Sequence, residues 1–251
     1  MSSTMNQNNP IANIEAVDLT KRYDDGLLAL DVLNLKVGPG EIYCLLGANG
    51  SGKTTALNLF VNFIQPSSGR ALVCGINVRE NPRQAKRYIA YVAEDVMLYG
   101  NFSARQNLEF FVRLGGKSEL TREDYYMALR EVGLQEKAFE QRLRHFSKGM
   151  RQKVSLAIAI SLDAPVMLLD EPTTGLDPKA AAEFLELLDQ QRQRGKAILV
   201  ATQDIFRAKD IANRVGIMME GRKVIEHTRD ELASEDIELL YLKYMRSGLV
   251  S

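Results

Sequence analysis

Residues 47–55 of this 251-residue chain are Gly47-Ala48-Asn49-Gly50-Ser51-Gly52-Lys53-Thr54-Thr55 and fit the pattern G-x-x-x-x-G-K-[ST]. The apolar run 42–46 before them predicts a buried strand, and the apolar residues between 56 and 64 predict a helix after them. Glycines let backbone N–H groups turn toward phosphates, and a helix N-terminus attracts anions. Lys53 can supply a cation to the β- and γ-phosphates, and the Thr54 hydroxyl can ligate Mg²⁺. This context favours a nucleoside triphosphate site over a glycine-rich turn with a surface lysine.

Composition limits the other classes of function. Lys+Arg and Asp+Glu both number 32, so the net charge does not favour binding to nucleic acid. Cys44 and Cys74 lie among apolar residues, which indicates neither a disulfide framework nor a metal site, and His145 and His227 stand alone. No run reaches the roughly 18 to 20 apolar residues of a membrane helix, and the polar residues 1–12 lack the features of a signal peptide. We expect a cytoplasmic protein with a disordered N-terminal tail at residues 1–12, for which a membrane partner remains open.

The order of periodic segments predicts an α/β fold interrupted by helices. Strands are predicted at residues 14–23, 27–37, 42–46, 70–74, 88–93, 166–169 and 197–201, with a hairpin formed by 215–219 and 223–225. Ser103 with Gln106, and Thr121 with Asp124, predict two capped helices, the second ending at Gly133. We therefore predict a P-loop nucleotide-binding domain at residues 13–230, with an antiparallel β-subdomain and an inserted helical subdomain at about 95–162. A C-terminal helical extension at residues 231–251 is predicted to follow.

A second nucleotide motif follows the predicted strand at 166–169. There four apolar residues end at two adjacent acids, Asp170 and Glu171. Ligands bind at the carboxyl ends of parallel strands. Asp170 can hold Mg²⁺, and Glu171 can polarise an attacking water. Two ionised carboxylates would repel each other without a cation, which disfavours a purely structural role.

A third segment is Ser147-Lys148-Gly149-Met150, followed by an apolar helical run. Ser147 is predicted to cap this helix, with Gly149 allowing close approach, so that N–H groups face an anion. Many helices begin in this way, so the segment by itself does not predict a function.

Taken together, the order of these motifs resembles that of the ATP-binding-cassette (ABC) ATPases, over residues 14–244. Ser147-Lys148-Gly149-Met150 stands where that family carries its Ser-Gly-Gly-Gln signature, and Gly175-Leu176-Asp177 matches its D-loop. Tyr23 matches the aromatic residue that stacks on adenine, although it could be an ordinary strand aromatic. The resemblance implies ATP and Mg²⁺ as ligands. It also implies a head-to-tail homodimer in which the signature acts in trans on ATP bound to the P-loop of the other subunit.

The sequence departs from this family pattern at two positions. Glu94 stands where most members have Gln, and its carboxylate could still reach Mg²⁺ or its water. Gln203 replaces the usual His of the switch segment. Gln can donate a hydrogen bond to a γ-phosphate but cannot become cationic. Because Glu171 is intact, hydrolysis is expected to be slower but real.

The leading interpretation is therefore the ATP-hydrolysing subunit of an exporter that pairs with a separate integral-membrane permease and lies peripherally on the cytoplasmic face of the membrane. One alternative is a nucleotide-dependent regulatory clamp with weak or no hydrolysis. Another is a soluble ABC protein acting on DNA or ribosomes, which the balanced charge disfavours. Four aromatic residues, Tyr99, Phe102, Phe110 and Phe111, either contact the permease or form the core of the helical insertion.

Overall fold

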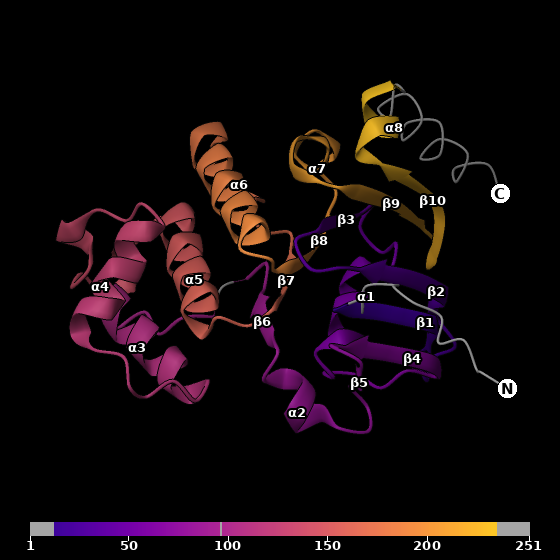
Figure 1. Ribbon diagram of the computed structural model, residues 1–251, viewed down its shortest axis with the longest axis horizontal. Coiled ribbons are helices and arrows are strands. Elements are labelled where there is room, and N and C mark those ends of the chain that lie inside the picture. The colour runs from indigo at the N-terminus through magenta and orange to yellow at the C-terminus, as the bar shows by residue number, and fades with distance from the viewer. Residues whose placement is uncertain (1–12, 96, 235–251) are drawn as a thin grey trace, which may run out of the picture.

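The described part of the chain, in the computed structural model, comprises residues 13–95 and 97–234, arranged as in Figure 1. The predicted tail at 1–12 and residues 235–251 of the predicted C-terminal extension therefore lie outside it. The described elements, in chain order, are β1 (Ile14–Arg22), β2 (Leu28–Val37), β3 (Ile42–Gly47), α1 (Lys53–Phe60), β4 (Ser68–Val73), β5 (Ile76–Asn77), α2 (Pro82–Lys86), β6 (Ile89–Val92), α3 (Ala104–Leu114), α4 (Arg122–Glu131), η1 (Glu136–Ala138), η2 (Leu143–His145), α5 (Lys148–Leu162), β7 (Val166–Asp170), α6 (Pro178–Gln193), β8 (Ala197–Thr202), α7 (Ile205–Ile211), β9 (Arg214–Met219), β10 (Arg222–Thr228) and α8 (Arg229–Ser234).

A mainly parallel sheet, in the order β10-β9-β3-β8-β7-β6, forms the centre of the molecule. Strands β3, β7 and β8 are buried along their whole length. Alternate residues of β3 enter two separate apolar clusters, because successive side chains of a strand point to opposite faces. The carboxyl ends of β3, β7 and β8 meet at one edge of the sheet, so the P-loop and the Asp170-Glu171 pair lie close together.

A second sheet is antiparallel, in the order β2-β1-β4-β5, and β1 pairs with β2 in the register Ile14 to Val37. The predicted α/β fold with an antiparallel β-subdomain is therefore confirmed. The short elements β5, α2 and α7 were not predicted, since each has too few residues to show a period. The predicted hairpin turn at Glu220-Gly221 does join β9 to β10.

Helix α1 is shorter than the apolar pattern predicts. It ends at Phe60, not at Ile64, because Asn62 adopts a left-handed backbone conformation with φ +56°. The Phe63 N–H then donates to the Asn58 carbonyl, which closes the helix. Asn is one of the few residues with a side chain that adopt this conformation readily.

Helices α3, α4 and α5 come between β6 and β7 in the chain, and they form a layer beside the central sheet (Figure 1). Both predicted capping boxes are present, at Ser103 with Gln106 and at Thr121 with Asp124. Leu108, Tyr125 and Val154 are buried in the same cluster as one face of β3. The inserted helices thus share a core with the sheet, which fixes their position relative to the P-loop strand.

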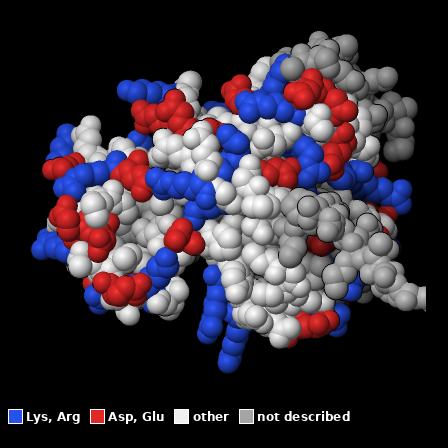
Figure 2. Space-filling model, in the orientation of Figure 1, with Lys and Arg blue, Asp and Glu red and all other residues white. Residues whose placement is uncertain are grey.

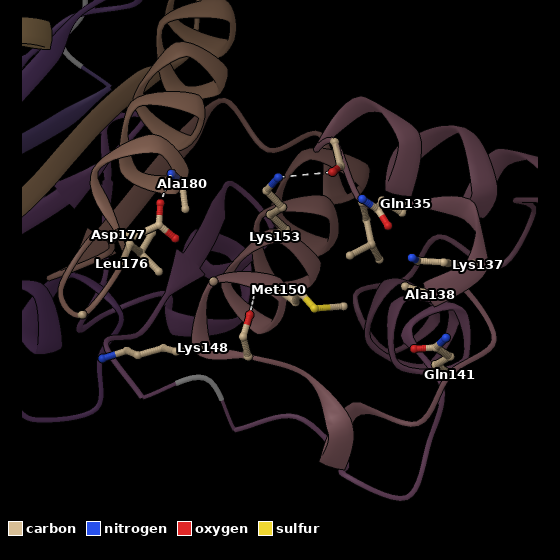
Figure 3. Close-up of a pocket in the computed structure, with 15 residues that line it drawn as sticks. Gln135, Lys137, Ala138, Gln141, Lys148, Met150, Lys153, Leu176, Asp177 and Ala180 are labelled. Carbon is tan, nitrogen blue, oxygen red and sulfur yellow. Dashed lines mark hydrogen bonds between the residues drawn. The ribbon is translucent and has the colours of Figure 1, made fainter.

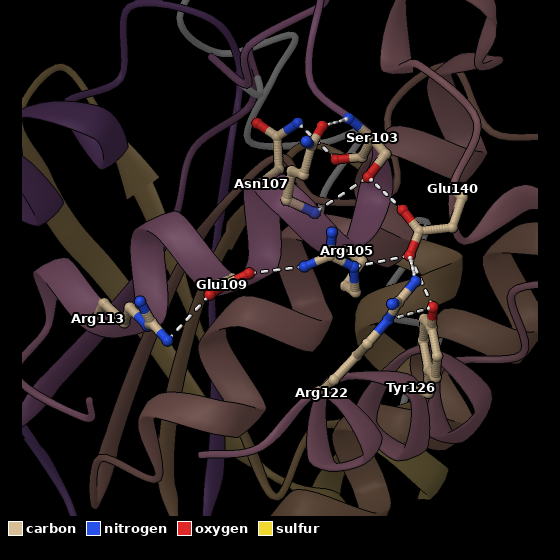
Figure 4. Close-up of polar contacts among 9 residues, drawn as sticks. Ser103, Arg105, Asn107, Glu109, Arg113, Arg122, Tyr126 and Glu140 are labelled. Carbon is tan, nitrogen blue, oxygen red and sulfur yellow. Dashed lines mark hydrogen bonds and ion pairs between the residues drawn. The ribbon is translucent and has the colours of Figure 1, made fainter. Parts of the chain in front are cut away.

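A polar network joins three parts of this insertion (Figure 4). Oε1 of Glu140 accepts hydrogen bonds from Arg105 (2.7 Å), Arg122 (2.8 Å) and Tyr126 (2.6 Å), and Oε2 accepts one from Ser103. Partial burial by itself would raise the pKa of Glu140. The donors from Tyr126, Arg105 and Arg122 outweigh this effect and lower the pKa to about 2. The network therefore favours the folded state wherever Glu140 is ionised.

We expect Glu140→Gln to lower the free energy of unfolding at pH 7 by about 1 kcal/mol, because solvent screens a side chain that is 45% exposed. The folded pKa of Glu140 lies below its ordinary value of 4.5, so this stabilisation is present above about pH 4.5 and is lost as the pH falls toward 2. Urea unfolding of both proteins across this range measures the effect. Glu136→Gln, at an exposed pair with Arg130, is the matched control and should change stability less. A constant difference between Glu140→Gln and wild type down to pH 2 would contradict this account.

Candidate nucleotide-binding and hydrolysis site

The P-loop runs from Gly47, the last residue of β3, to Lys53, the first residue of α1. Gly52 has φ +104°, and a Cβ there would lie 2.5 Å from the Ala29 carbonyl oxygen. A Cβ on Gly47 would lie 2.5 Å from Ser51 Oγ. Both positions therefore require glycine. Of the remaining predicted loop residues, Asn49, Gly50 and Thr54 are exposed, Ala48 and Thr55 are partly buried, and Ser51 is buried.

Lys53 joins the loop to the second motif. Its side chain is only 5% exposed, and its Nζ donates to the carbonyl oxygens of Gly47 (2.8 Å) and Ala48 (3.2 Å). The same Nζ lies 3.6 Å from Oε1 of Glu171. One ammonium group thus faces both the phosphate loop and the carboxylate at the end of β7.

Thr54 and Asp170 bring two hard oxygen atoms together, with Thr54 Oγ1 donating to Asp170 Oδ1 at 3.2 Å. Burial raises the pKa of Asp170, and the charges of Glu171 and Glu94 act in the same direction against the Thr54 hydrogen bond. Within the described residues, no three His, Cys, Asp or Glu side chains form a metal-binding group. Mg²⁺ is commonly held by one or two carboxylates together with substrate phosphates and water, so this pair of oxygens fits Mg²⁺ bound with a nucleotide.

Glu94 is exposed and follows β6, and its negative charge contributes to the raised pKa of Asp170. Its backbone oxygen accepts a hydrogen bond of 3.5 Å from Nε2 of Gln152, a fully buried residue of α5. Gln152 belongs to no motif that the sequence alone reveals, and its only signal is a glutamine next to the apolar run of this helix.

Glu171 and Gln203 follow two adjacent parallel strands, β7 and β8. Glu171 is buried and has φ +41°, a conformation that costs a non-glycine residue about 1 to 3 kcal/mol and is concentrated at functional sites. Its N–H donates to the Ala201 carbonyl oxygen at 2.9 Å, which ties the two strand ends together. Gln203 is exposed at the same edge of the sheet.

The Ser147-Lys148-Gly149-Met150 segment begins α5, and Ser147 Oγ accepts from the Met150 N–H at 3.3 Å, as predicted for a cap. This segment and Gly175-Leu176-Asp177 line one side of a cavity of about 650 Å³ (Figure 3). The other side is lined by Gly133, Leu134, Gln135, Lys137, Ala138 and Gln141. Among the described residues that line this cavity, none belongs to the P-loop. Ser147-Lys148-Gly149-Met150 therefore lines a cavity that the described P-loop residues of the same chain do not line.

Two glycines in this cavity differ in what they require. A Cβ on Gly149 would meet Leu176 at 3.5 Å, which is ordinary contact, so packing within this chain does not require glycine here, and the close approach of an anion stays a prediction. Gly175 has φ +75° and does need the freedom of glycine. The aliphatic part of Lys148 lies against Gly175, and this contact joins the signature to the D-loop.

Tyr23 lies just beyond the last residue of β1, and its N–H donates to the Leu27 carbonyl oxygen at 2.9 Å. Its ring is partly buried, and Lys21 Nζ lies 5.1 Å from the ring centroid. Tyr23 is therefore not within a regular strand. Its stacking on adenine stays a prediction.

A family model described as ABC transporter matches residues 30–174. Nod factor export ATP-binding protein I of Burkholderia thailandensis is 35% identical over 227 residues, which are 90% of this chain and 74% of that protein. The probable multidrug ABC transporter ATP-binding protein YbhF of Escherichia coli is 31% identical over 222 residues, which are 88% of this chain and 38% of that protein.

Solved structures show the same fold. An ATP-binding subunit of an ABC transporter superposes with a TM-score of 0.81 at 29% identity, covering 92% of this chain and 98% of its own. A dimeric ATP-binding cassette in a post-hydrolysis state, bound to ADP and Pi, superposes with a TM-score of 0.79 at 25% identity, covering 86% of this chain and 98% of its own.

The fold and the site define the class of P-loop nucleoside triphosphatases, with a phosphate loop after one strand and paired carboxylates at the end of another. Within that class, the chain belongs to the ABC transporter family as an ATP-binding subunit, and it is an ATPase. No helix in the described ranges 13–95 and 97–234 has the length and apolar character needed to cross a membrane.

Proposed function

We propose that this ATPase powers an exporter, acting with Mg²⁺ as a head-to-tail homodimer held on the cytoplasmic face of the membrane by a separate permease. The export direction is supported by relatives that are named for the export of Nod factor. The permease partner is supported by family membership. Residues 13–230 act as the ATPase domain and residues 95–162 as its helical subdomain, with 231–251 as an extension.

One observation carries this proposal, namely that the signature and the P-loop belong to separate sites of one chain. Ser147, Lys148 and Met150 line a cavity with the D-loop, whereas Lys53 and Thr54 lie at the carboxyl edge of the central sheet. Two copies arranged head to tail would bring each signature to the phosphates bound by the other copy. A structural relative is itself a dimeric cassette.

The chain's own residues supply the parts of the hydrolysis reaction. The loop 47–52 and Lys53 bind and orient the phosphates, and Thr54, Asp170 and Glu94 would hold Mg²⁺. The metal, when bound, neutralises charge on the β- and γ-phosphates. Glu171 accepts a proton from water as the water oxygen bonds to the γ-phosphorus, and the bond to the β-phosphate oxygen breaks to leave ADP. Tyr23 stacks on adenine.

The aromatic group Tyr99, Phe102, Phe110 and Phe111 fits a contact with the permease better than a core. Tyr99, Phe102 and Phe110 are 48%, 39% and 38% exposed, and Tyr99 lies 5.1 to 5.9 Å, centroid to centroid, from the other three rings. The buried core of the insertion consists of other residues, including Leu108, Val112 and Leu129. An exposed aromatic group of this kind is typical of a protein interface.

Cysteine cross-linking tests this assembly. Single cysteines at Tyr99 and Phe102 should cross-link to cytoplasmic loops of the proposed permease, after Cys74 is replaced by Ser. Met127→Cys is the matched control, since Met127 is an exposed apolar residue of α4 in the same insertion. Cross-links at Met127 alone, or at none of these positions in membranes that retain the protein, would exclude this surface. Failure of the protein to remain on salt-washed membranes with the permease would exclude the transporter assignment.

The switch residue gives a further prediction. A hydrogen bond to a charged group contributes about 1.5 to 3 kcal/mol. Gln203 can donate such a bond to the γ-phosphate, but, unlike His, it cannot add a positive charge to it. We expect Gln203→His to raise the ATP turnover rate about 5- to 30-fold, equivalent to about 1 to 2 kcal/mol, with ATP affinity nearly unchanged. Steady-state kinetics and calorimetry measure the two quantities. An unaltered or lower turnover rate would show that Gln203 does not limit hydrolysis.

A further inference from the structure

We propose that Thr202 is a positioning residue for ATP hydrolysis, which holds one oxygen of the Glu171 carboxylate and leaves the other for the attacking water. The inference rests on the proposed role of Glu171 as the proton acceptor. Thr202 is the last residue of β8 and precedes Gln203. Thr174, in the turn after Glu171, assists it.

The hydroxyl of Thr202 bridges two segments at the edge of the sheet. Its Oγ1 accepts a hydrogen bond from the Asp204 N–H at 3.0 Å. The same hydroxyl donates its only proton to Oε2 of Glu171 at 3.3 Å. An ionised carboxylate can only accept, so the direction of this second bond is determined. Thr202 thus links the carboxylate to the loop that carries Gln203.

The two oxygens of the Glu171 carboxylate have different surroundings. Oε2 also accepts from Thr174 Oγ1 at 3.2 Å and is therefore held by two hydroxyl groups. Oε1 accepts no hydrogen bond from any described residue and lies 3.6 Å from Lys53 Nζ. The carboxylate is anchored through one oxygen, and the other faces the ammonium group that binds phosphate.

Burial makes the two hydroxyl groups difficult to replace by water. Glu171 is 6% and Thr202 4% exposed, so bulk water has little access to replace a missing hydroxyl. The backbone of Glu171 is already held by the bond from its N–H to Ala201. What remains free is rotation of the side chain, and the two hydroxyls restrict it. Since general-base catalysis depends on the placement of the accepting oxygen, losing a hydroxyl should lower the rate of the chemical step and not ATP binding.

The test compares Thr202→Val, which removes the hydroxyl at nearly constant shape, with Thr202→Ser, which keeps it. We expect Thr202→Val to lower kcat about 10-fold, equivalent to about 1.4 kcal/mol, with the KM for ATP changed less than about twofold. Thr202→Ser should restore most of kcat. Thr228→Val is the matched control, because Thr228 also bonds to a glutamate, Glu231, but lies on β10 outside the site, and its kcat should equal that of wild type.

A double-mutant comparison separates positioning from a general structural effect. If Thr202 acts through Glu171, adding Thr202→Val to Glu171→Gln should leave the residual single-turnover rate unchanged. An equal 10-fold loss in that background, an unchanged kcat in Thr202→Val, or failure of Thr202→Ser to restore kcat would each overturn the inference.

Two further results keep the outcomes distinct. If Thr202→Val does not fold, as judged by its thermal unfolding, Thr174→Val removes the second hydroxyl from a less buried position. It should lower kcat by a smaller factor through the same coupling to Glu171, and additivity with Glu171→Gln would overturn the inference. Full turnover by Glu171→Gln would instead contradict the proposed function itself. A wild-type kcat in Thr202→Val would contradict only the role of Thr202.

Discussion

Glu171→Gln is expected to lower ATP hydrolysis by a factor of about 100 to 10,000 while leaving ATP binding intact, because it removes the carboxylate that accepts a proton from water. Gln has nearly the same shape, and its side-chain oxygen can still accept hydrogen bonds from Thr174 and Thr202. Thr54, Asp170 and Lys53 remain in place to bind the phosphates and the metal. Binding and chemistry should therefore separate in this variant.

The same variant should accumulate an ATP-bound dimer. If hydrolysis reopens the dimer, a chain that binds ATP without hydrolysing it stays closed. Size-exclusion chromatography with and without ATP, and turnover measured by phosphate release, test the two halves of this prediction. Asp170→Asn is an informative comparison, because it removes the metal-binding carboxylate and should prevent both binding and dimer formation. Normal turnover by Glu171→Gln, or a wholly monomeric protein with ATP bound, contradicts the assignment.

Lys53→Ala should weaken ATP binding about 10- to 150-fold. This range corresponds to the loss of one hydrogen bond between charged groups, about 1.5 to 3 kcal/mol. The Lys53 ammonium is held by the carbonyl oxygens of Gly47 and Ala48 beside the loop that binds the phosphates. Calorimetric titration with ATP and Mg²⁺ measures the change.

The matched control for this variant is Lys196→Ala. Lys196 is also a buried lysine, but it pairs with Asp163 and donates to the Ala164 carbonyl oxygen, away from the P-loop. Its replacement should lower stability without changing ATP affinity. Wild-type affinity in Lys53→Ala would exclude the P-loop as the phosphate site, whereas equal loss in both variants would indicate a folding defect.

The face of the molecule in Figure 2 carries Lys, Arg, Asp and Glu side chains interspersed with one another. This pattern agrees with equal totals of 32 basic and 32 acidic residues. Mixed charge gives no long-range attraction to a polyanion, so recognition depends on local groups such as the P-loop.

The sequence by itself determined the features that depend on neighbouring residues. The P-loop, the caps at Ser103, Thr121 and Ser147, and the two carboxylates at the end of β7 can all be predicted from residues within a few positions of each other. Their hydrogen bonds close short rings or involve the backbone of the next turn, so the local pattern is sufficient to predict them. The resemblance to ABC ATPases then followed from the order of these motifs.

Only the tertiary structure decided which distant side chains meet. Thr202 contacts Glu171 because β7 and β8 are parallel neighbours. Lys53 reaches Glu171 because β3, which leads into the P-loop, and β7 end at the same edge of the sheet. The exposure of Tyr99 depends on the packing of other residues into the core. No periodic pattern or residue spacing in the sequence predicts these features. The contacts depend on the order of strands in the sheet, and the exposure of Tyr99 depends on which residues fill the core.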